Sequence, residues 1–308
     1  MKKIIVIVVS YNGSGWIRYC LSSLLNSNVR CDIMVVDNAS TDNTVDIITR
    51  DFGDVLLIKN TKNLGFGLAN NLGLNYAIAN NYDFVFLINQ DVAVLADSIA
   101  KIIELFEAEP LGQVGLISPL HLNWDGNDLE RGFNQFIREG IDERWFGDVL
   151  LNRQEVKYKI DFVNAAAWCI PVPVLKQIGG FDPLFSHYCE DNDWVNRLKL
   201  KGFSVYITTY AKIMHSSNFK NWEQIKNDSN RIRLIYFSRI KNLEASLMSN
   251  LIMLFKSELE YVLTLLINRQ FRTINVVFKS LFLALVNVPR IIKSRNLSKR
   301  ESAFLNVG

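Results

Sequence analysis

Several features that would define other protein classes are missing from this sequence of 308 residues. Its four cysteines show no CxxC pair and no ladder of short spacings, so neither a disulfide framework nor a zinc site is predicted. It contains no internal repeat, no low-complexity segment and no apolar run of the roughly 20 residues that a membrane-spanning helix requires. These absences fit a folded protein of a reducing compartment.

The amino terminus resembles a secretory signal peptide but lacks two of its features. Lys2 and Lys3 precede an apolar run at residues 4–9, which is too short for the hydrophobic region of a signal peptide. No small-residue cleavage site follows the run. We therefore interpret residues 4–9 as the first buried strand.

Charge is distributed unevenly along the chain. Residues 1–211 carry 18 Lys and Arg against 25 Asp and Glu, whereas residues 212–308 carry 16 against 6. The basic part is also rich in Leu, Ile, Val and Phe, which favours a membrane surface over nucleic acid as its partner. Helices packed on the rest of the protein, or a homodimer interface, would bury such apolar residues equally well.

Short β-branched runs alternate with helical stretches through the first half, a pattern typical of a parallel sheet covered by helices. The predicted strands of this half are residues 4–9, 31–37, 55–59 and 84–88, and the predicted helices are 16–27, 44–52 and 67–80. A later helix is expected at 191–201, a strand at 203–208, and helices from about residue 230 onward.

Polar residues follow the first two strands. Ser10, Tyr11 and Asn12 end one strand and Asp37 ends the next, so all four should face one crevice outside the sheet. Asp37 is placed to accept hydrogen bonds from a base or a ribose, although a turn that caps the following helix explains it as well. The small residues around Asn63, Gly65 and Asn70 suit close approach of backbone to a ligand, or simple helix packing.

Asn89, Gln90 and Asp91 follow the fourth strand. A carboxylate at the end of a buried strand is a suitable ligand for Mg²⁺ or Mn²⁺, which would neutralise a diphosphate leaving group. The alternative is a cap for the helix expected near Ser98.

Three acids stand within four residues at the start of the helix expected at 191–201: Glu190, Asp191 and Asp193. The helix dipole favours ionised carboxylates there, which suits a general base; a solvated acidic turn is the alternative. His215, one of three histidines, is placed to reach a metal or a diphosphate, or to serve structure alone.

Taken in this order over residues 3–245, these stretches resemble the family 2 glycosyltransferases with the GT-A fold, particularly the bacterial rhamnosyltransferase-like branch. The helical, basic and apolar pattern beyond residue 245 predicts C-terminal amphipathic helices. For the residues before it, the resemblance implies an α/β, Rossmann-like and mostly parallel central sheet with flanking helices. It implies a catalytic domain at 1–245, with a nucleotide-sugar-binding half at 1–105 and an acceptor-binding and catalytic half at 106–245. A membrane-associating region at 246–308 follows.

The resemblance also implies roles for individual residues. Asp191 is the expected catalytic base, with Glu190 as the next candidate, and Asp91 and His215 are the expected ligands of a divalent cation, Mg²⁺ or Mn²⁺. Asn89 stands where the family's DXD triplet begins with Asp, so one anionic ligand is missing. Trp168 offers a flat face on which an acceptor sugar can stack, although packing in the core explains a tryptophan there as well. The expected acceptor-binding residues are Trp168, Asp193 and Trp194. The expected donor-binding residues are Ser10, Tyr11, Asn12, Asp37, Asn63, Gly65, Asn70, Asn89, Gln90 and Asp91.

The implied activity is inverting transfer of a sugar, L-rhamnose from dTDP-L-rhamnose first, onto a lipid-linked saccharide for cell-surface polysaccharide such as O-antigen or capsule. UDP-galactofuranose, UDP-glucose and UDP-N-acetylglucosamine are the alternative donors. A peripheral enzyme at the cytoplasmic face of the plasma membrane fits this activity. A nucleotidyltransferase is disfavoured because residues 11–16 contain no Lys or Arg, and a non-catalytic sugar-binding protein is disfavoured by the acidic cluster and His215.

Overall fold

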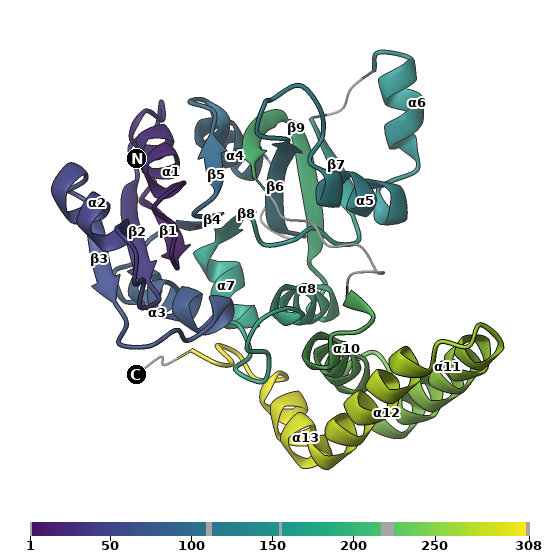
Figure 1. Ribbon diagram of the computed structural model, residues 1–308. Helices are drawn as coiled ribbons and strands as arrows, with labels where there is room; N and C mark the ends of the chain where they lie inside the picture. Colours follow the sequence, from purple (N-terminus) through teal and green to yellow (C-terminus); the bar gives the residue numbers. More distant parts are fainter. Residues whose placement is uncertain (1, 109–112, 154–155, 217–224, 306–308) are drawn as a thin grey trace.

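The computed structural model describes residues 2–108, 113–153, 156–216 and 225–305. Within these residues, nine strands form one sheet in the order β3-β2-β1-β4-β8-β6-β9-β5, and β7 also pairs with β9. Helices cover both faces of the sheet, and a group of C-terminal helices lies beyond α8 (Figure 1).

The first half of the sheet is parallel, as its sequence pattern predicts. Its strands are β1 (Ile4–Ser10), β2 (Asp32–Asp37), β3 (Leu56–Lys59) and β4 (Phe84–Asn89), and its helices are α1 (Ile17–Leu25), α2 (Thr44–Asp51) and α3 (Phe66–Ala79). Ile5 and Ile7 of β1 enter the core on one face, and Ile4, Val6 and Val8 enter the core on the other. Both faces are covered, so the strand is apolar throughout.

The second half of the sheet is mixed, whereas a mostly parallel sheet is expected from the sequence. Strand β8 inserts between β4 and β6 and is antiparallel to both. Its direction is set by hydrogen bonds to strands that are far from it in the sequence, so the local sequence pattern does not predict it. Strand β9 continues past the expected end at residue 208 to His215. The elements of this half are β5 (Val92–Val94), α4 (Ser98–Glu107), β6 (Val114–Leu122), α5 (Arg131–Gly140), α6 (Arg144–Leu150), β7 (Lys157–Ile160), β8 (Ala167–Pro171), α7 (Val172–Ile178), α8 (Glu190–Leu200) and β9 (Ser204–His215).

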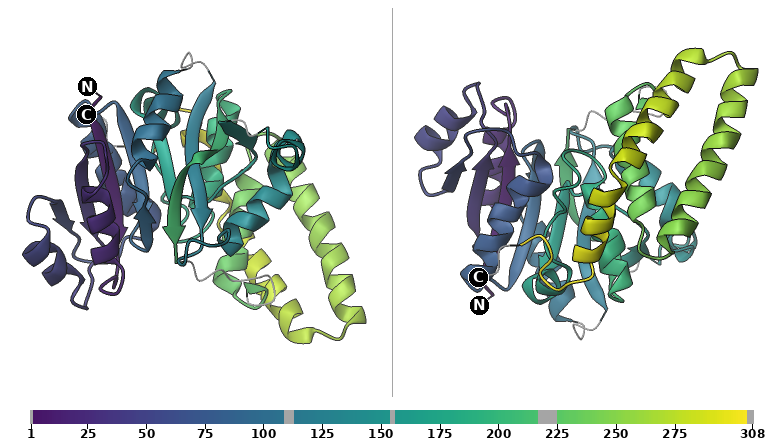
Figure 2. Two further views of the ribbon diagram at one scale, coloured as in Figure 1. Left: turned by 90° about the horizontal axis from the view of Figure 1, so that it is seen from above. Right: turned by 90° about the horizontal axis from the view of Figure 1, so that it is seen from below.

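The C-terminal helices have a core of their own. They are α10 (Ser229–Lys241), α11 (Leu247–Ile267), α12 (Phe271–Val286) and α13 (Val288–Leu297), and α10 packs against the other three. Helices α11 and α12 form a hairpin that projects away from the sheet (Figure 2). Since α10 shares this core, the domain boundary expected at residue 245 stays a prediction.

Among the described helices, none alone has the length and apolar character to cross a bilayer; α12 and α13 pass that test only as a pair, bent by 59°.

After α13 the chain returns to the sheet domain beside α3 and α7 (Figures 1 and 2). The Gly180 amide donates to the Ala303 carbonyl at 2.8 Å, and Asn71 Nδ2 donates to the Phe304 carbonyl at 3.3 Å. A Cβ at Gly179 would lie 2.1 Å from the Ala303 oxygen, and Gly179 has a φ of 86°. Glycine is therefore required where the returning chain meets the sheet domain.

Candidate active site

A cavity of about 1060 Å³ lies where β4 and β9 end. Asn89 and Asp91 enter it from the end of β4, and His215 enters it from the end of β9. The other walls come from α5, α8 and α10, from the loop at residues 161–166 and from the residues just before α8. The strand-end position is the one expected of a ligand site in an open α/β sheet.

The loops after β1 and β2 are joined into one unit by hydrogen bonds. Asp37 accepts hydrogen bonds from Ser10 Oγ at 3.0 Å and from the Ser40 amide at 2.9 Å. Asn12, in a left-handed conformation with a φ of 48°, accepts a bond from the Thr41 amide at 2.8 Å. The residues predicted from these two loops are therefore brought together.

Gln90 ties the β1 loop to the loop after β4. Its Oε1 accepts from the Tyr11 amide at 3.0 Å, and its Nε2 donates to the Tyr11 carbonyl at 3.1 Å. A Cβ at Gly13 would lie 2.0 Å from Gln90 Oε1. Sequence reasoning missed this role of Gly13, because the contact joins positions far apart in the chain.

The glycine-rich loop joins the donor half to the catalytic half. Asn63 Oδ1 accepts a hydrogen bond from the Gly65 amide at 2.8 Å, and Gly65 has a φ of 82°. A Cβ at Gly65 would lie 2.0 Å from the Ser186 carbonyl oxygen, in the segment before α8. The absence of a side chain thus lets α3 approach the segment that leads to the acids.

Three of the predicted donor-binding residues are enclosed by protein. Ser10 is 0%, Asp37 1% and Asn70 1% exposed. Asn70 Nδ2 donates to the Phe66 carbonyl in its own helix at 3.0 Å. Direct contact of these three side chains with a donor therefore stays a prediction.

Asp91 and His215 form the predicted metal-binding pair. Asp91 Oδ1 lies 3.6 Å from His215 Nε2, and both residues line the cavity. In the described part of the chain, no group of three or more His, Cys, Asp or Glu side chains is placed to hold a metal ion. One carboxylate and one imidazole fit a cation that takes its remaining ligands from a diphosphate and water.

His121 lies behind this pair and was missed from the sequence. Its ring centre is 6.0 Å from that of His215, and its Nε2 is 3.0 Å from Ser118 Oγ. Burial, and secondarily His215, holds the pKa of His121 well below its usual range. His121 is therefore a neutral residue that supports His215.

Glu190 and Asp191 begin α8 and line the cavity. The two residues before them are left-handed, with a φ of 77° at Tyr188 and 68° at Cys189. Such conformations cost about 1–3 kcal/mol each for residues other than glycine and cluster at functional sites. This turn aims the first residues of α8 at the cavity.

The two acids at the start of α8, Glu190 and Asp191, influence each other's ionisation. Burial and the charge of Asp191 raise the pKa of Glu190 to about 8. Burial also raises the pKa of Asp191, against backbone hydrogen bonds and the charge of Arg231. Because the charge of Asp191 helps to raise the pKa of Glu190, Asp191 is the acid of the pair that loses its proton first, whereas Glu190 still holds its proton at neutral pH.

The predicted acceptor-binding roles of Trp168, Asp193 and Trp194 are wrong. Both tryptophans are 0% exposed, with ring centres 5.4 Å apart in the core, and Trp194 Nε1 donates to the Gly179 carbonyl at 2.8 Å. Asp193 is engaged by cations of the protein. Helical geometry explains the error, because residues 193 and 194 face the interior whereas Asp191 faces the cavity.

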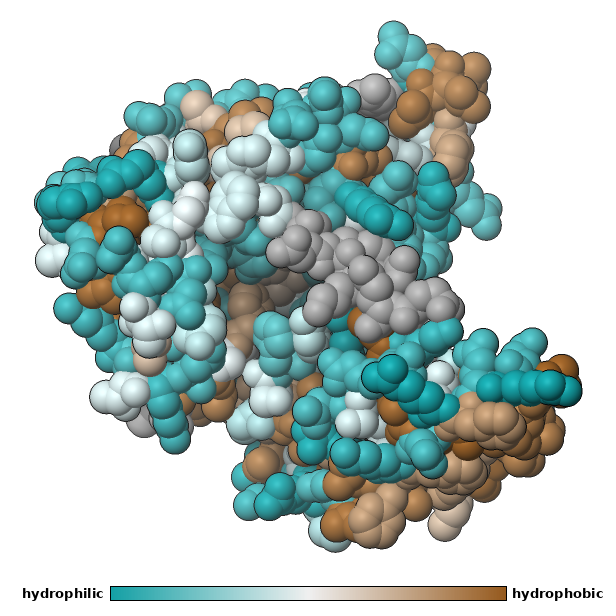
Figure 3. All heavy atoms as spheres, viewed as in Figure 1, coloured by the Kyte–Doolittle hydropathy of each residue, from teal (hydrophilic) through white to brown (hydrophobic). Residues whose placement is uncertain are grey.

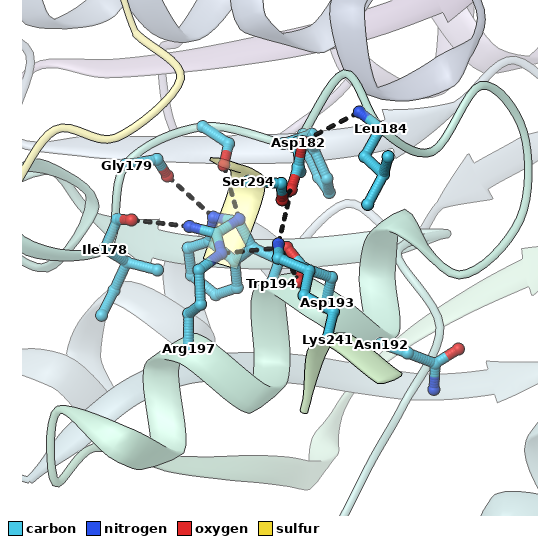
Figure 4. A network of polar contacts seen from close by, with 12 residues as sticks. Ile178, Gly179, Asp182, Leu184, Asn192, Asp193, Trp194, Arg197, Lys241 and Ser294 are labelled. Atoms are coloured by element: carbon cyan, nitrogen blue, oxygen red, sulfur yellow. Dashed lines mark hydrogen bonds and ion pairs between the residues drawn. The ribbon is translucent and has the colours of Figure 1, made fainter. Parts of the chain in front are cut away.

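A buried ionic network fastens α8 to the C-terminal helices (Figure 4). Lys241 of α10 lies 2.5 Å from Asp182 Oδ2 and also pairs with Asp193, which accepts a bond from Arg197 Nε at 3.0 Å. Ser294 of α13 hydrogen-bonds to Asp182. These charged groups are at most 7% exposed, so each depends on its partners.

Comparison with known proteins decides the class of this site. The sequence model of the family described as Glycosyl transferase family 2 matches residues 5–159, half of the chain. The chain belongs to glycosyl transferase family 2. It is therefore a glycosyltransferase, and the match includes the loops after β1 and β2 and residues Asn89, Gln90 and Asp91.

This glycosyltransferase resembles several characterised proteins. It is 26% identical over 232 residues to an N-acetylglucosaminyl-diphospho-decaprenol L-rhamnosyltransferase of Mycobacterium tuberculosis, with 68% of this chain and 75% of the relative covered. The mannosyltransferase PcManGT from Pyrobaculum calidifontis, solved with GDP-Man and Mn²⁺, has 15% identity and a TM-score of 0.59 over 93% of this chain and 88% of its own.

The structure of S. aureus TarS 1–349 in complex with UDP has 17% identity and a TM-score of 0.51 over 80% of this chain and 68% of its own. These structural likenesses confirm the expected nucleotide-sugar transferase fold. Glu190, Asp191 and His215 lie beyond the family match at residue 159, so their roles stay predictions.

Proposed function

We propose that this glycosyltransferase moves L-rhamnose from dTDP-L-rhamnose onto a lipid-linked saccharide, with inversion, in the synthesis of bacterial cell-surface polysaccharide such as O-antigen or capsule. The observation that carries the proposal is the shared cavity of the Glu190–Asp191 pair and the Asp91–His215 pair. The name of the Mycobacterium tuberculosis relative supports both the rhamnose and the lipid-linked acceptor. UDP-galactofuranose, UDP-glucose and UDP-N-acetylglucosamine are the donors to test against dTDP-L-rhamnose.

In the proposed reaction Asp191 takes the proton of an acceptor hydroxyl. The hydroxyl oxygen forms a bond to the anomeric carbon from the face opposite the diphosphate, and the bond from that carbon to the phosphate oxygen breaks. Asp91 and His215 would hold Mg²⁺ or Mn²⁺, which when bound neutralises charge on the departing diphosphate. The Mn²⁺ in the mannosyltransferase structure supports this cofactor.

A panel of nucleotide sugars tests the donor. We expect dTDP-L-rhamnose to bind the purified protein in ligand-observed NMR, more tightly with Mg²⁺ or Mn²⁺ than without, and Asp91→Asn to remove the metal dependence. Exclusive binding of a UDP-sugar would replace rhamnose in the proposal. Binding of none of these donors by folded protein would overturn it.

We further propose that the enzyme is peripheral at the cytoplasmic face of the plasma membrane and contacts lipid through α11 and α12. The projecting hairpin carries a large apolar surface (Figure 3). Exposed apolar residues on it are Met248, Ile252, Phe255, Leu259, Leu263, Phe271, Phe278 and Phe282, and exposed basic residues are Lys256, Arg269, Arg272 and Lys279. Apolar groups flanked by cations suit an anionic lipid surface.

Substitution of the hairpin surface tests the membrane proposal. We expect the triple substitution Ile252→Ser, Leu259→Ser and Phe282→Ser to lower the affinity for phosphatidylglycerol-containing vesicles, measured by flotation, by at least about 100-fold. Each apolar side chain that is buried in the lipid contributes about 1.5–3 kcal/mol to binding. Val149→Ser, Leu150→Ser and Leu151→Ser, on and beside α6, remove equally exposed apolar groups as a control. Equal flotation of the two triple variants would contradict lipid binding, and loss of a dimer by the first would support the homodimer alternative.

A further inference from the structure

Arg231 of α10 is an unusual residue for its place in the cavity. Of the described residues that line the cavity, it is the single Lys or Arg. Six carboxyl side chains line the same cavity: Asp91, Glu130, Glu139, Asp161, Glu190 and Asp191. Among the described lining residues, Arg231 is therefore the side chain whose permanent positive charge favours an anionic group of a ligand.

The guanidinium of Arg231 is held against an aromatic ring but has no acidic partner among the described side chains. It lies 4.0 Å from the centre of the Tyr188 ring. No described side chain forms an ion pair or hydrogen bond with it. A guanidinium stacked on a ring keeps its planar edge of N–H donors available, and that edge matches two phosphate oxygens at once.

The charge of Arg231 acts at the reacting end of the cavity. Burial raises the pKa of Asp191, and backbone hydrogen bonds followed by the charge of Arg231 lower it. Burial lowers the pKa of His187, and the charge of Arg231 lowers it further. Arg231 is thus close to the proposed base. Asp91 and His215, which are proposed to hold the metal ion at the donor diphosphate, lie at the ends of β4 and β9, whereas Arg231 lies on α10.

One turn further along α10, Ile235 leads away from the cavity. It is four residues after Arg231, so the two share a face of the helix and are about 6 Å apart along its axis. Ile235 also lines a second cavity of about 340 Å³ between α10, α11 and α12. Its apolar walls include Ile232, Tyr261 and Val277.

An acidic residue that lines the second cavity, Glu258, already has protein partners for its carboxylate. Glu258 accepts a hydrogen bond from Tyr236 at 2.6 Å and pairs with Arg239 at 3.0 Å. The cavity lies within the helices whose outer surface is apolar. Base, cation, apolar side chain and apolar cavity therefore follow one another in the direction of the proposed lipid-binding hairpin.

We propose that Arg231 binds the diphosphate that joins the acceptor saccharide to its lipid carrier, and that Ile235 begins the path of the lipid toward the second cavity. The assignment rests on the proposed lipid-linked acceptor. In such an acceptor a sugar, a diphosphate and an isoprenoid chain follow in that order, and Asp191, Arg231 and Ile235 present a base, a cation and an apolar surface in the same order.

Two acceptors with one saccharide and one lipid chain test the assignment in the full-length enzyme, one linked through diphosphate and one through an uncharged ether. Arg231→Gln should raise the KM for the diphosphate acceptor by about 10- to 100-fold, the range of a lost charged hydrogen bond. Its kcat, its KM for the donor and its KM for the ether acceptor should stay within a factor of about three, below the effect of one net hydrogen bond. Arg231→Lys should recover part of the loss.

Arg138→Gln is the matched control, since it removes the same charge from an exposed position on α5 that does not line the cavity. It should leave all these constants unchanged. An equal loss with both acceptors, or a rise in the donor KM, would overturn the assignment to the acceptor diphosphate.

Binding of farnesyl diphosphate, followed by NMR, separates this inference from the proposed function. Transfer to neither acceptor by the wild-type enzyme would contradict the proposed function. Weaker binding of farnesyl diphosphate by folded Arg231→Gln than by Arg138→Gln would still support the diphosphate site, and equal or undetectable binding by the wild-type protein and Arg231→Gln would overturn it.

Discussion

Asp191→Asn should lower kcat by about 10²- to 10⁴-fold, the usual contribution of a general base. The substitution keeps the size of the side chain and its place at the start of α8, so the KM for the donor should change little. Steady-state kinetics on donor and acceptor, with donor binding measured separately by NMR, check this result. Retention of more than a few per cent of turnover would refute the assignment and make Glu190 the next candidate.

Asp161→Asn is the control for this substitution, because Asp161 lines the same cavity and its side chain is 74% exposed. It should retain most of the activity. Glu190→Gln should also retain activity at neutral pH, where Glu190 already holds a proton because its pKa is raised to about 8.

The pH profile provides an independent readout of the base. Asp191 acts when ionised, and burial raises its pKa above the ordinary value of 3.8. The kcat/KM of the wild-type enzyme should therefore fall as the pH drops through this raised pKa, at a higher pH than for an ordinary aspartate. Glu190→Gln should keep this acid limb and remove any change in activity near pH 8.

Lys241→Met should lower the free energy of unfolding by about 3–5 kcal/mol, the cost of removing one partner from a buried ionic network. Lys241 is 2% exposed, and without it Asp182 and Asp193 lose a shared cation. Urea unfolding at neutral pH measures the change. Lys199→Met is the control on α8, because Lys199 pairs with the exposed Asp161 and such surface pairs contribute about 0–1 kcal/mol.

The sign of the pH dependence follows from Asp193. Burial opposes its ionisation, but Lys241 and Arg197 outweigh burial and hold its pKa below the ordinary value of 3.8. This contribution to stability is therefore present above pH 3.8 and is lost as the pH falls through the lowered pKa. Lys241→Met should remove most of this acid-dependent loss, and a change in stability of less than about 1 kcal/mol at neutral pH, the size of a surface pair, would contradict the network's role.

Local patterns in the sequence explain the first half of the fold. Strand β1 is apolar at every position from Ile4 to Val8 because both of its faces are covered, and the polar residues begin where the strand ends. The rule that ligands bind at strand ends then places Asn12 and Asp91 beside one crevice. These signals depend on neighbouring residues, so they can be read without the tertiary structure.

The second half depends on contacts between residues far apart. Strand β8 takes its direction from pairing with β4 and β6. The tail at residues 302–305 meets Gly179 and Gly180, and Lys241 meets Asp182 from a position 59 residues away. Such pairings leave no periodicity in the sequence, which is why the roles of Lys241, His121 and Arg231 were not predicted.

The acidic segment at the start of α8 shows both what the sequence can predict and what it cannot. Its composition marked the cluster of Glu190, Asp191 and Asp193 as suited to a general base, because the helix dipole favours ionised carboxylates there. The resemblance to family 2 glycosyltransferases then singled out Asp191, with Glu190 as the next candidate. Only the tertiary structure decided that Asp191 faces the cavity whereas Asp193 and Trp194 are buried. The sequence determined which chemical groups are available, and packing determined their roles, because the partners that bury or expose each side chain come from distant parts of the chain.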